Sequence, residues 1–189
     1  RKLRSGDCIA SILARETQML ACVDVGYNNS AARAACVTFD DWEDANPSGE
    51  FTLDIDQVEP YIPGQFYRRE LPCLLSVLNQ LPESPAVIVV DGYVWLDDKD
   101  RKGLGHHLYD ALQQSVPVIG VAKTEFAGAT QAVEIHRRTS ARPLFVTAVG
   151  IETDRAADYI RRMHGHSRIP TLLKRVDTLS RLATTNDKE

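Results

Sequence analysis

The sequence lacks any apolar run long enough to cross a lipid bilayer. Its longest apolar stretches, such as residues 85–90, span only a few residues, whereas a membrane helix requires about 20. The chain begins with Arg-Lys-Leu-Arg, but no long apolar segment follows, which is unlike a secretory signal peptide. We therefore expect a protein that does not cross a membrane and that is located in the cytoplasm.

Cysteine is also scarce. The four cysteines are Cys8, Cys22, Cys36 and Cys73, and no two of them form a Cys-x-x-Cys pair or have zinc-finger spacing. This pattern argues against a structural zinc site and against a disulfide scaffold. We expect reduced thiols that are mostly buried.

The chain has no excess of positive charge that would indicate a nucleic-acid partner. The formal net charge is −4, with a balance of −8 over residues 1–119 and +4 over residues 120–189. Divalent cations would offset several acids in the first part if those acids formed a metal site. The basic C-terminal part is equally consistent with a solvated helical face. Charge alone therefore does not decide the class of partner.

Internal repeats, low-complexity segments and linkers are absent as well. The 189 residues are 43% hydrophobic and 25% charged, which is ordinary for a globular protein. This length is sufficient for one domain with a substantial core. We predict a single domain over residues 1–189.

The order of the apolar patterns predicts the fold class. Strands are expected at residues 19–27, 34–39, 51–58, 86–91, 116–122 and 144–149. Helices are expected from residue 66 to about 81 and at residues 105–114, 153–164 and 171–183. The first three strands are expected to form an antiparallel meander, and the later strands to be parallel. This order predicts an α/β domain with a ribonuclease H-like mixed sheet, flanked by helices.

Three acidic residues are expected near the edge of the sheet where α/β proteins bind their ligands. Asp24 and Asp91 each end a predicted strand, and Glu70 falls in the first turns of the helix between them. Carboxylates that meet at one sheet edge would bind Mg²⁺ or Mn²⁺, which promote phosphodiester hydrolysis. Lys123 follows the strand at 116–122 and would bring a positive charge to the phosphate. The alternative for any single acid is a helix cap or a solvated side chain.

Local motifs around these residues resemble those of the endonuclease V family. Cys-Val-Asp24-Val-Gly-Tyr27 is similar to the family's first strand motif, Val-Asp-Val-Ala/Ser-Tyr. Tyr61-Ile-Pro-Gly64, followed by Arg69-Glu70, resembles its Tyr-Ile-Pro-Gly loop and Arg-Glu pair. Val-Val-Asp91-Gly92 resembles its strand that ends in Asp-Gly.

Further resemblances follow in the family's order. Gly103-Leu-Gly-His-His-Leu108 is similar to its Gly-Leu-Ala-Ser-His-Leu segment, and Val118-Ile-Gly-Val-Ala-Lys123 matches its Ile-Gly-Val-Ala-Lys motif. Arg168-Ile-Pro170 and Arg175-Val-Asp177 resemble its late Arg-hydrophobic-Pro segment and the Ala-Asp or Ala-His that follows. The matches extend from about residue 20 to residue 180.

The resemblance implies a ribonuclease H-like nuclease that depends on Mg²⁺ or Mn²⁺. It implies cleavage near deaminated purines, above all inosine, in DNA, RNA or both, with a 3′-hydroxyl and a 5′-phosphate left at the nick. By position, Asp24, Glu70 and Asp91 would be the metal ligands and members of the catalytic set. Asp177 would be a fourth acidic member, and Lys123 the phosphate contact.

The same resemblance implies a substrate-binding set. A loop that separates the strands beside the lesion would contain Pro60, Tyr61, Ile62 and Pro63. Backbone NH groups near Gly64, Gly92 and Gly105 would line a pocket for a flipped base. His107 aligns with a family histidine, for which a structural role is the alternative. Tyr61 is suited to stacking on a base, or alternatively to packing within the loop.

One segment departs from the family pattern. After Asp91-Gly92 the family continues towards a His-Pro-Arg segment, whereas this chain reads Tyr93-Val-Trp-Leu-Asp97, with Asp97 in place of the histidine. Tyr93 and Trp95 would stack on nucleobases or pack against the core. This change leaves the preferred lesion open.

Three hypotheses follow. The first is a monomeric, metal-dependent endonuclease that acts on nucleic acid containing deaminated bases. The second is a non-catalytic module that retains the fold and binds lesions or nucleic acid. The third is a ribonuclease H-like nuclease with another substrate, such as a recombination intermediate.

Overall fold

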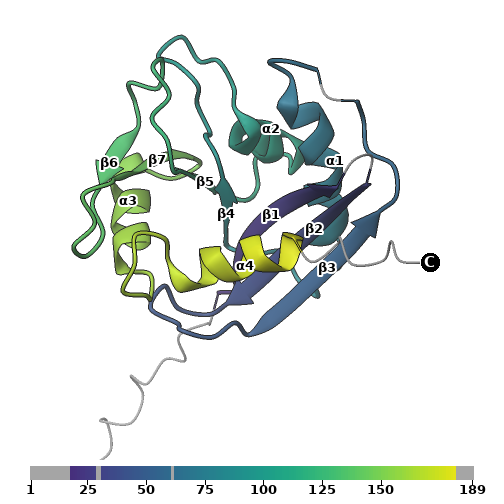
Figure 1. Cartoon of the computed structure of the whole chain (residues 1–189), viewed down its shortest axis with the longest axis horizontal. Coiled ribbons are helices and arrows are strands. Elements are labelled where there is room, and N and C mark those ends of the chain that lie inside the picture. Colours follow the sequence, from purple (N-terminus) through teal and green to yellow (C-terminus); the bar gives the residue numbers. More distant parts are fainter. Residues whose placement is uncertain (1–17, 29–30, 61, 182–189) are drawn as a thin grey trace, which may run out of the picture.

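The strands form one mixed β-sheet in the order β3-β2-β1-β4-β5-β7-β6 (Figure 1). The computed structural model describes residues 18–28, 31–60 and 62–181. The strands within these ranges are β1 Leu20–Asn28, β2 Ala31–Phe39, β3 Gly49–Ile55, β4 Val87–Asp91, β5 Val118–Ala122, β6 Val133–Ile135 and β7 Leu144–Val149. The helices are α1 Phe66–Leu78, α2 Leu104–Ala111, α3 Thr153–Arg162 and α4 Thr171–Arg181.

The first three strands form the predicted antiparallel meander. β2 begins three residues before its predicted start, because its ladder with β1 continues to the pair Asn28 and Ala31. The alanines of β2 have low strand propensity, so pairing with both neighbours decides their conformation. β3 ends at Ile55, where its ladder with β2 ends.

The parallel part of the sheet is smaller than predicted. β1 pairs with β4, and β4 with β5, in parallel. β7 instead runs antiparallel to β5, so the prediction of parallel later strands is wrong for β7. No helix separates β5 from β7, and a parallel neighbour needs a long crossover connection. The chain also contains β6, whose three residues are too few to show a strand pattern in the sequence.

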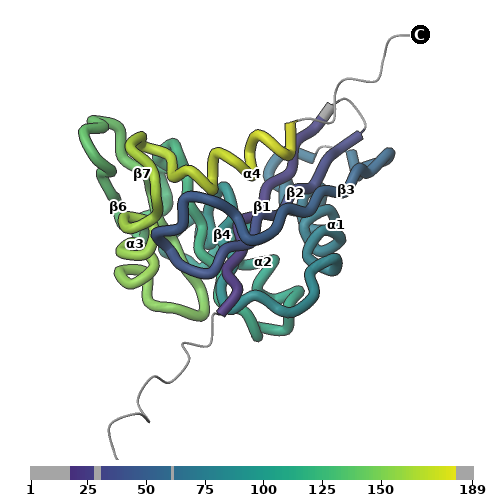
Figure 2. Tube along the Cα trace, turned by 90° about the horizontal axis from the view of Figure 1, so that it is seen from below, coloured from purple at the N-terminus to yellow at the C-terminus, as the bar shows by residue number. Residues whose placement is uncertain are grey.

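Helices cover both faces of the sheet, and each face has its own core (Figure 2). α3 and α4 pack on one face, and α1 and α2 on the other. Successive side chains of β1 alternate between the two cores: Cys22 belongs to the α3/α4 core, whereas Ala21 and Val23 belong to the α1/α2 core. This alternation is the two-residue period of a strand buried on both faces.

The helix ends differ from the predicted ends by a few residues. α1 ends at Leu78 and continues only as hydrogen-bonded turns. α2 ends at Ala111, and Gln113 and Gln114 then adopt φ angles of 56° and 60°, which terminate a right-handed helix.

The cysteines agree with the prediction where the structure describes them. Cys22, Cys36 and Cys73 are free and buried, and Cys8 lies outside the described residues. Across the described part of the chain, every helix is too short or too polar to pass through a bilayer.

Candidate active site

The register of the parallel strands brings Asp24 and Asp91 together. Val23 of β1 pairs with Val90 of β4, so the two aspartates that follow lie next to each other at the same sheet edge. Glu70 reaches this edge from the second turn of α1. All three carboxylates line one small cavity, as the positions of the elements in the sequence predict.

Burial and neighbouring negative charge raise the pKa values of Glu70 and Asp24. Glu70 is buried, and its pKa is raised to about 8 by loss of solvation and by the charges of Asp24 and Asp91. Burial also raises the pKa of Asp24, although a hydrogen bond from Ser180 Oγ at 2.8 Å works in the opposite direction. Negative charge is thus concentrated at this edge at a cost in stability.

The donor set fits a hard divalent cation. Its ligand atoms are all carboxylate oxygens, which Mg²⁺ and Mn²⁺ prefer, and a cation would relieve the repulsion that raises the pKa of Glu70. Across the described residues, however, no group of three His, Cys, Asp or Glu side chains already surrounds one point in a metal-binding arrangement. The Asp91 carboxylate is instead paired with an ammonium group in this arrangement.

That ammonium group belongs to Lys123, directly after β5. Lys123 Nζ forms an ion pair with Asp91 Oδ2 and lies 3.9 Å from Asp177 Oδ1. Burial lowers the pKa of Lys123, but the neighbouring carboxylates raise it by more, so its pKa is above the ordinary value. Lys123 therefore keeps its charge at the site.

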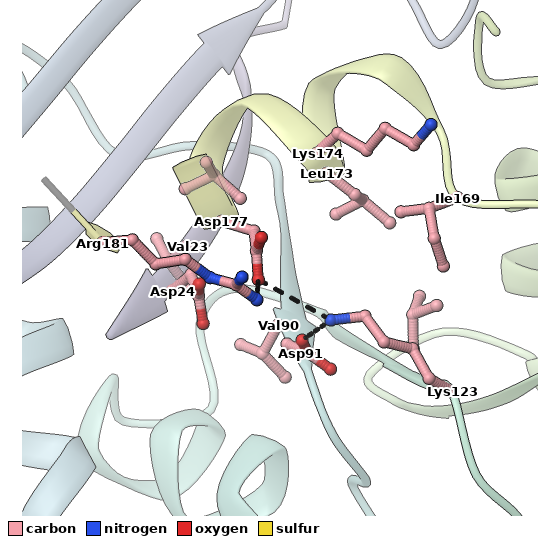
Figure 3. Close-up of a pocket in the computed structure, with 12 residues that line it drawn as sticks. Val23, Asp24, Val90, Asp91, Lys123, Ile169, Leu173, Lys174, Asp177 and Arg181 are labelled. Carbon is pink, nitrogen blue, oxygen red and sulfur yellow. Dashed lines mark hydrogen bonds and ion pairs between the residues drawn. The ribbon is translucent and has the colours of Figure 1, made fainter. Parts of the chain in front are cut away.

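α4 completes the site from the other side. Asp177 lies near Lys123, and Arg181 Nη2 donates a hydrogen bond of 2.8 Å to Asp177 Oδ1. Figure 3 shows Lys123 and Arg181 reaching towards the carboxylates from opposite sides. Ser180, which holds Asp24, has no motif in the sequence that would single it out. Gly26 of β1 permits this packing, because a Cβ at that position would overlap the backbone carbonyl of Ser180.

Two larger cavities meet at Asp91. The first, called here the α4 cavity, encloses about 310 Å³ and is lined by Val23, Asp24, Val90, Asp91, Val121, Lys123, Ile169, Leu173, Lys174, Val176, Asp177 and Arg181 (Figure 3). The second, called the α1 cavity, encloses about 250 Å³ and is lined by Gly64, Phe66, Tyr67, Glu70, Asp91, Gly92, Tyr93, Leu96, Lys102, Gly103 and Leu104. The carboxylates thus lie between two spaces on opposite sides of the sheet edge.

Two of the predicted pocket glycines line the α1 cavity. Gly64 and Gly92 have φ angles of 78° and 128°, which favour glycine. A Cβ at either position would meet nothing within 4 Å, so both leave the cavity wall open. The residues predicted to separate strands, Pro60, Ile62 and Pro63, are exposed in the loop before α1, and Tyr61 lies outside the described residues.

Gly105 and His107 are placed differently. Gly105 is buried in α2, where a Cβ would lie 2.7 Å from Val94 Cγ2, so its small size serves packing. The His107 ring stacks on Tyr67 with ring centroids 3.6 Å apart. Neither residue lines the α1 or the α4 cavity. Gly103, two residues earlier, lines the α1 cavity instead.

The departing segment after Gly92 is folded into a hydrogen-bonded loop. Asp97 Oδ1 accepts hydrogen bonds from the backbone NH groups of Lys99 and Arg101, both at 3.0 Å. Asp97 thus stabilises a turn. Tyr93 is buried, and its hydroxyl donates to Thr124 O at 2.9 Å. Trp95 Nε1 donates to a backbone carbonyl at 3.2 Å, so both aromatic rings are held within the protein.

We expect Glu70→Gln to stabilise the protein when divalent cations are absent. An acid whose pKa is raised on folding reduces stability as the pH rises from its unfolded-state pKa towards its folded-state pKa. For Glu70 this window ends at about pH 8. In EDTA at pH 8, the variant should therefore have a higher melting temperature than wild type. The increase should be roughly 2–4 °C for each kcal/mol by which the free energy of unfolding rises. The difference should disappear below the ordinary pKa of glutamate.

Thermal melts in EDTA and in Mg²⁺ at both pH values measure this effect. Glu83→Gln, in an exposed loop, is the matched control and should show no gain. Equal melting temperatures of Glu70→Gln and wild type at pH 8 in EDTA would contradict a pKa of Glu70 that burial and the neighbouring carboxylates raise.

Comparison with known proteins shows which family this chain is similar to. A sequence model described as Endonuclease V matches residues 8–178. An Endonuclease V of Streptomyces avermitilis is 32% identical over 189 residues, which cover 85% of this chain and 78% of the relative. The crystal structure of Endonuclease V from the same species has a TM-score of 0.69 at 27% identity and covers 87% of this chain and 80% of that chain.

A second solved structure shows the same fold at lower identity. Endonuclease V of Ciona intestinalis, in complex with a 24mer DNA containing an inosine followed by a ribo-adenosine, has a TM-score of 0.70 at 20% identity. It covers 87% of this chain and 84% of that chain. These likenesses confirm the ribonuclease H-like architecture predicted from the order of the elements.

Proposed function

The chain belongs to the endonuclease V family, and on this basis we propose that it hydrolyses phosphodiester bonds near deaminated bases, above all inosine, with Mg²⁺ or Mn²⁺ as cofactor. The observation that best supports this proposal is the meeting of Asp24, Glu70 and Asp91 at one cavity. The nucleic acid is DNA or RNA. The DNA in the Ciona relative contains inosine, which favours this lesion as the first substrate to test.

Each side chain of the site has a separate task. Asp24, Glu70 and Asp91 would hold the divalent cation. The chemistry that such an ion supplies is an activated water and compensation of negative charge on the phosphate. Lys123 stays protonated beside Asp91 and contacts a non-bridging phosphate oxygen. Asp177 and Ser180 position Lys123 and Asp24 through the contacts described above.

The α1 cavity is suited to a base that has left the helix stack. It adjoins Glu70 and Asp91, and its lining includes Gly64, Gly92 and Gly103 together with Tyr67 and Tyr93. Aromatic faces and backbone groups bind flipped bases in enzymes that act on a single nucleotide. The exposed loop at Pro60, Ile62 and Pro63 adjoins this cavity through Gly64, and would enter the space that the flipped base leaves.

Incubation with labelled oligonucleotides tests the proposal. Single- and double-stranded DNA and RNA, each with one inosine, are cleaved in Mg²⁺ or Mn²⁺ but not in EDTA, and matched oligonucleotides with adenine or guanine remain intact. Binding in Ca²⁺ without cleavage in Mg²⁺ or Mn²⁺ would instead support the non-catalytic module. Preferential cleavage of branched or mismatched substrates would support a nuclease with another substrate.

A further inference from the structure

The α4 cavity extends well beyond the groups that the proposed chemistry requires. Asp24, Asp91, Lys123 and Asp177 occupy only part of its wall. The remaining wall is mainly aliphatic and consists of Val23, Val90, Val121, Ile169, Leu173 and Val176. Figure 3 shows Leu173 and Ile169 on the α4 side of this cavity, with Lys123 reaching Asp91 below them. The reaction at the carboxylates does not explain an apolar space of about 310 Å³.

Three cationic side chains line this apolar space, together with the carboxylates of Asp24, Asp91 and Asp177. Lys123 and Arg181 line it, although each is already paired with a carboxylate. Lys174 also lines it, is exposed, and forms no ion pair within the described ranges of the chain. An apolar floor with cationic side chains around it fits a ligand with a flat apolar body and phosphates attached, which is the chemistry of a nucleotide.

The position of the cavity indicates which nucleotide it would take. Asp91 lines both the α1 cavity and the α4 cavity. A strand with its flipped base in the α1 cavity would therefore pass its backbone across Asp91 and Lys123 and reach the α4 side. The two cavities would then hold bases on opposite sides of the cleaved bond.

We propose that the α4 cavity binds the nucleobase of the nucleotide immediately 3′ to the cleaved bond. This inference rests on the proposed function, because it takes the carboxylates as the cleavage site and the α1 cavity as the lesion pocket. The aliphatic wall has no hydrogen-bonding groups that could read the edge of a base. Contact with the base is therefore tolerant of sequence, and its contribution comes from apolar surface removed from water.

Abasic substrates test this subsite in the wild-type protein. Single-stranded inosine oligonucleotides are prepared with one tetrahydrofuran abasic residue at each position around the cleaved bond, and dissociation constants are measured in Ca²⁺ by fluorescence anisotropy. Loss of the base immediately 3′ to the cleaved bond should weaken binding about five- to tenfold, the effect expected when roughly 40–55 Å² of apolar surface is no longer removed from water. An equal dissociation constant for this substrate and the intact one would overturn the inference.

Filling the α4 cavity with a larger side chain should abolish the dependence of binding on the base immediately 3′ to the cleaved bond. Leu173→Trp places a large ring in the α4 cavity, so the intact and the abasic substrate should bind this variant equally. Leu75→Trp is the matched control, because Leu75 is a half-buried leucine of α1 that lines neither cavity, and it should retain the five- to tenfold ratio. Ile169→Trp, in the loop before α4, fills the same space if Leu173→Trp does not fold.

Different results would refute the proposed function and the proposed subsite. Absence of cleavage of every inosine substrate would refute the proposed function. Normal cleavage of the intact substrate, combined with an unchanged ratio in Leu173→Trp or with sensitivity only to bases 5′ of the lesion, would refute the subsite and leave the nuclease assignment in place.

Discussion

Replacement of Asp91 by asparagine is expected to lower the rate of inosine-dependent cleavage by about a thousandfold, or roughly 4 kcal/mol of transition-state stabilisation. Asp91 ends the central strand β4 and lines both large cavities and the small one between them. Its side chain thus faces every space that substrate or metal would occupy. Asparagine keeps the size of the side chain but removes the charge that a divalent cation requires.

Stability should change little in this variant. Asp91 is exposed, and loss of its charge also relieves the repulsion felt by Asp24 and Glu70. Single-turnover cleavage in Mg²⁺ and a thermal melt separate the two effects. Asp158→Asn removes an exposed carboxylate that pairs with Arg161 on α3, and it should cleave as wild type does. Wild-type rates in Asp91→Asn would refute the assignment of this edge as the active site.

Replacement of Lys123 by methionine is expected to lower kcat about a hundredfold with little change in KM, because the charge acts mainly as negative charge develops on the phosphate. Lys123 is exposed, but its ion pair with Asp91 and its proximity to Asp177 hold the ammonium group at the carboxylates. Methionine retains the length and the apolar part of the side chain. The variant therefore tests the charge rather than the packing.

Lys123→Arg keeps the charge but has a planar group of different shape, so it should recover only part of the activity. Lys99→Met removes an exposed lysine from the loop after Gly92 and serves as the control, with activity close to wild type. A rise in KM at unchanged kcat in Lys123→Met would show instead that Lys123 only helps to bind the nucleic acid.

The polar groups around the cavities differ in how well the sequence predicts their place in the site. Asp91 ends β4 and Glu70 lies early in α1, as predicted, but Asp24 does not end its strand, because β1 continues to Asn28. The parallel register of β1 and β4 then brings Asp24 and Asp91 together. Ser180 lies in α4 without any recognisable motif, and it reaches Asp24 only because α4 packs on β1. Contacts of this kind depend on how a helix packs on the sheet. Arg181 instead pairs with Asp177 of the same helix at the local i, i+4 spacing.

The glycines predicted to line the pocket also differ in how well the sequence predicts their role. Gly64, Gly92 and Gly105 look alike in the sequence, since each follows or lies within a family motif. In the structure, Gly64 and Gly92 have positive φ angles and face open space, whereas Gly105 is closed in by Val94. The residue type reports only that a side chain is absent, and the surroundings decide whether this serves a ligand or the core.

The sequence by itself determined the fold class, the antiparallel start of the sheet and the chemical character of the site, because strand periodicity, strand ends and residue types are local properties. The tertiary structure decided that β7 runs antiparallel, that His107 stacks on Tyr67, and that an aliphatic cavity adjoins the carboxylates beneath α4. These features arise where segments far apart in the chain pack together. Their spacing is set by the sheet register and by the side chains between helix and sheet, which no local pattern records.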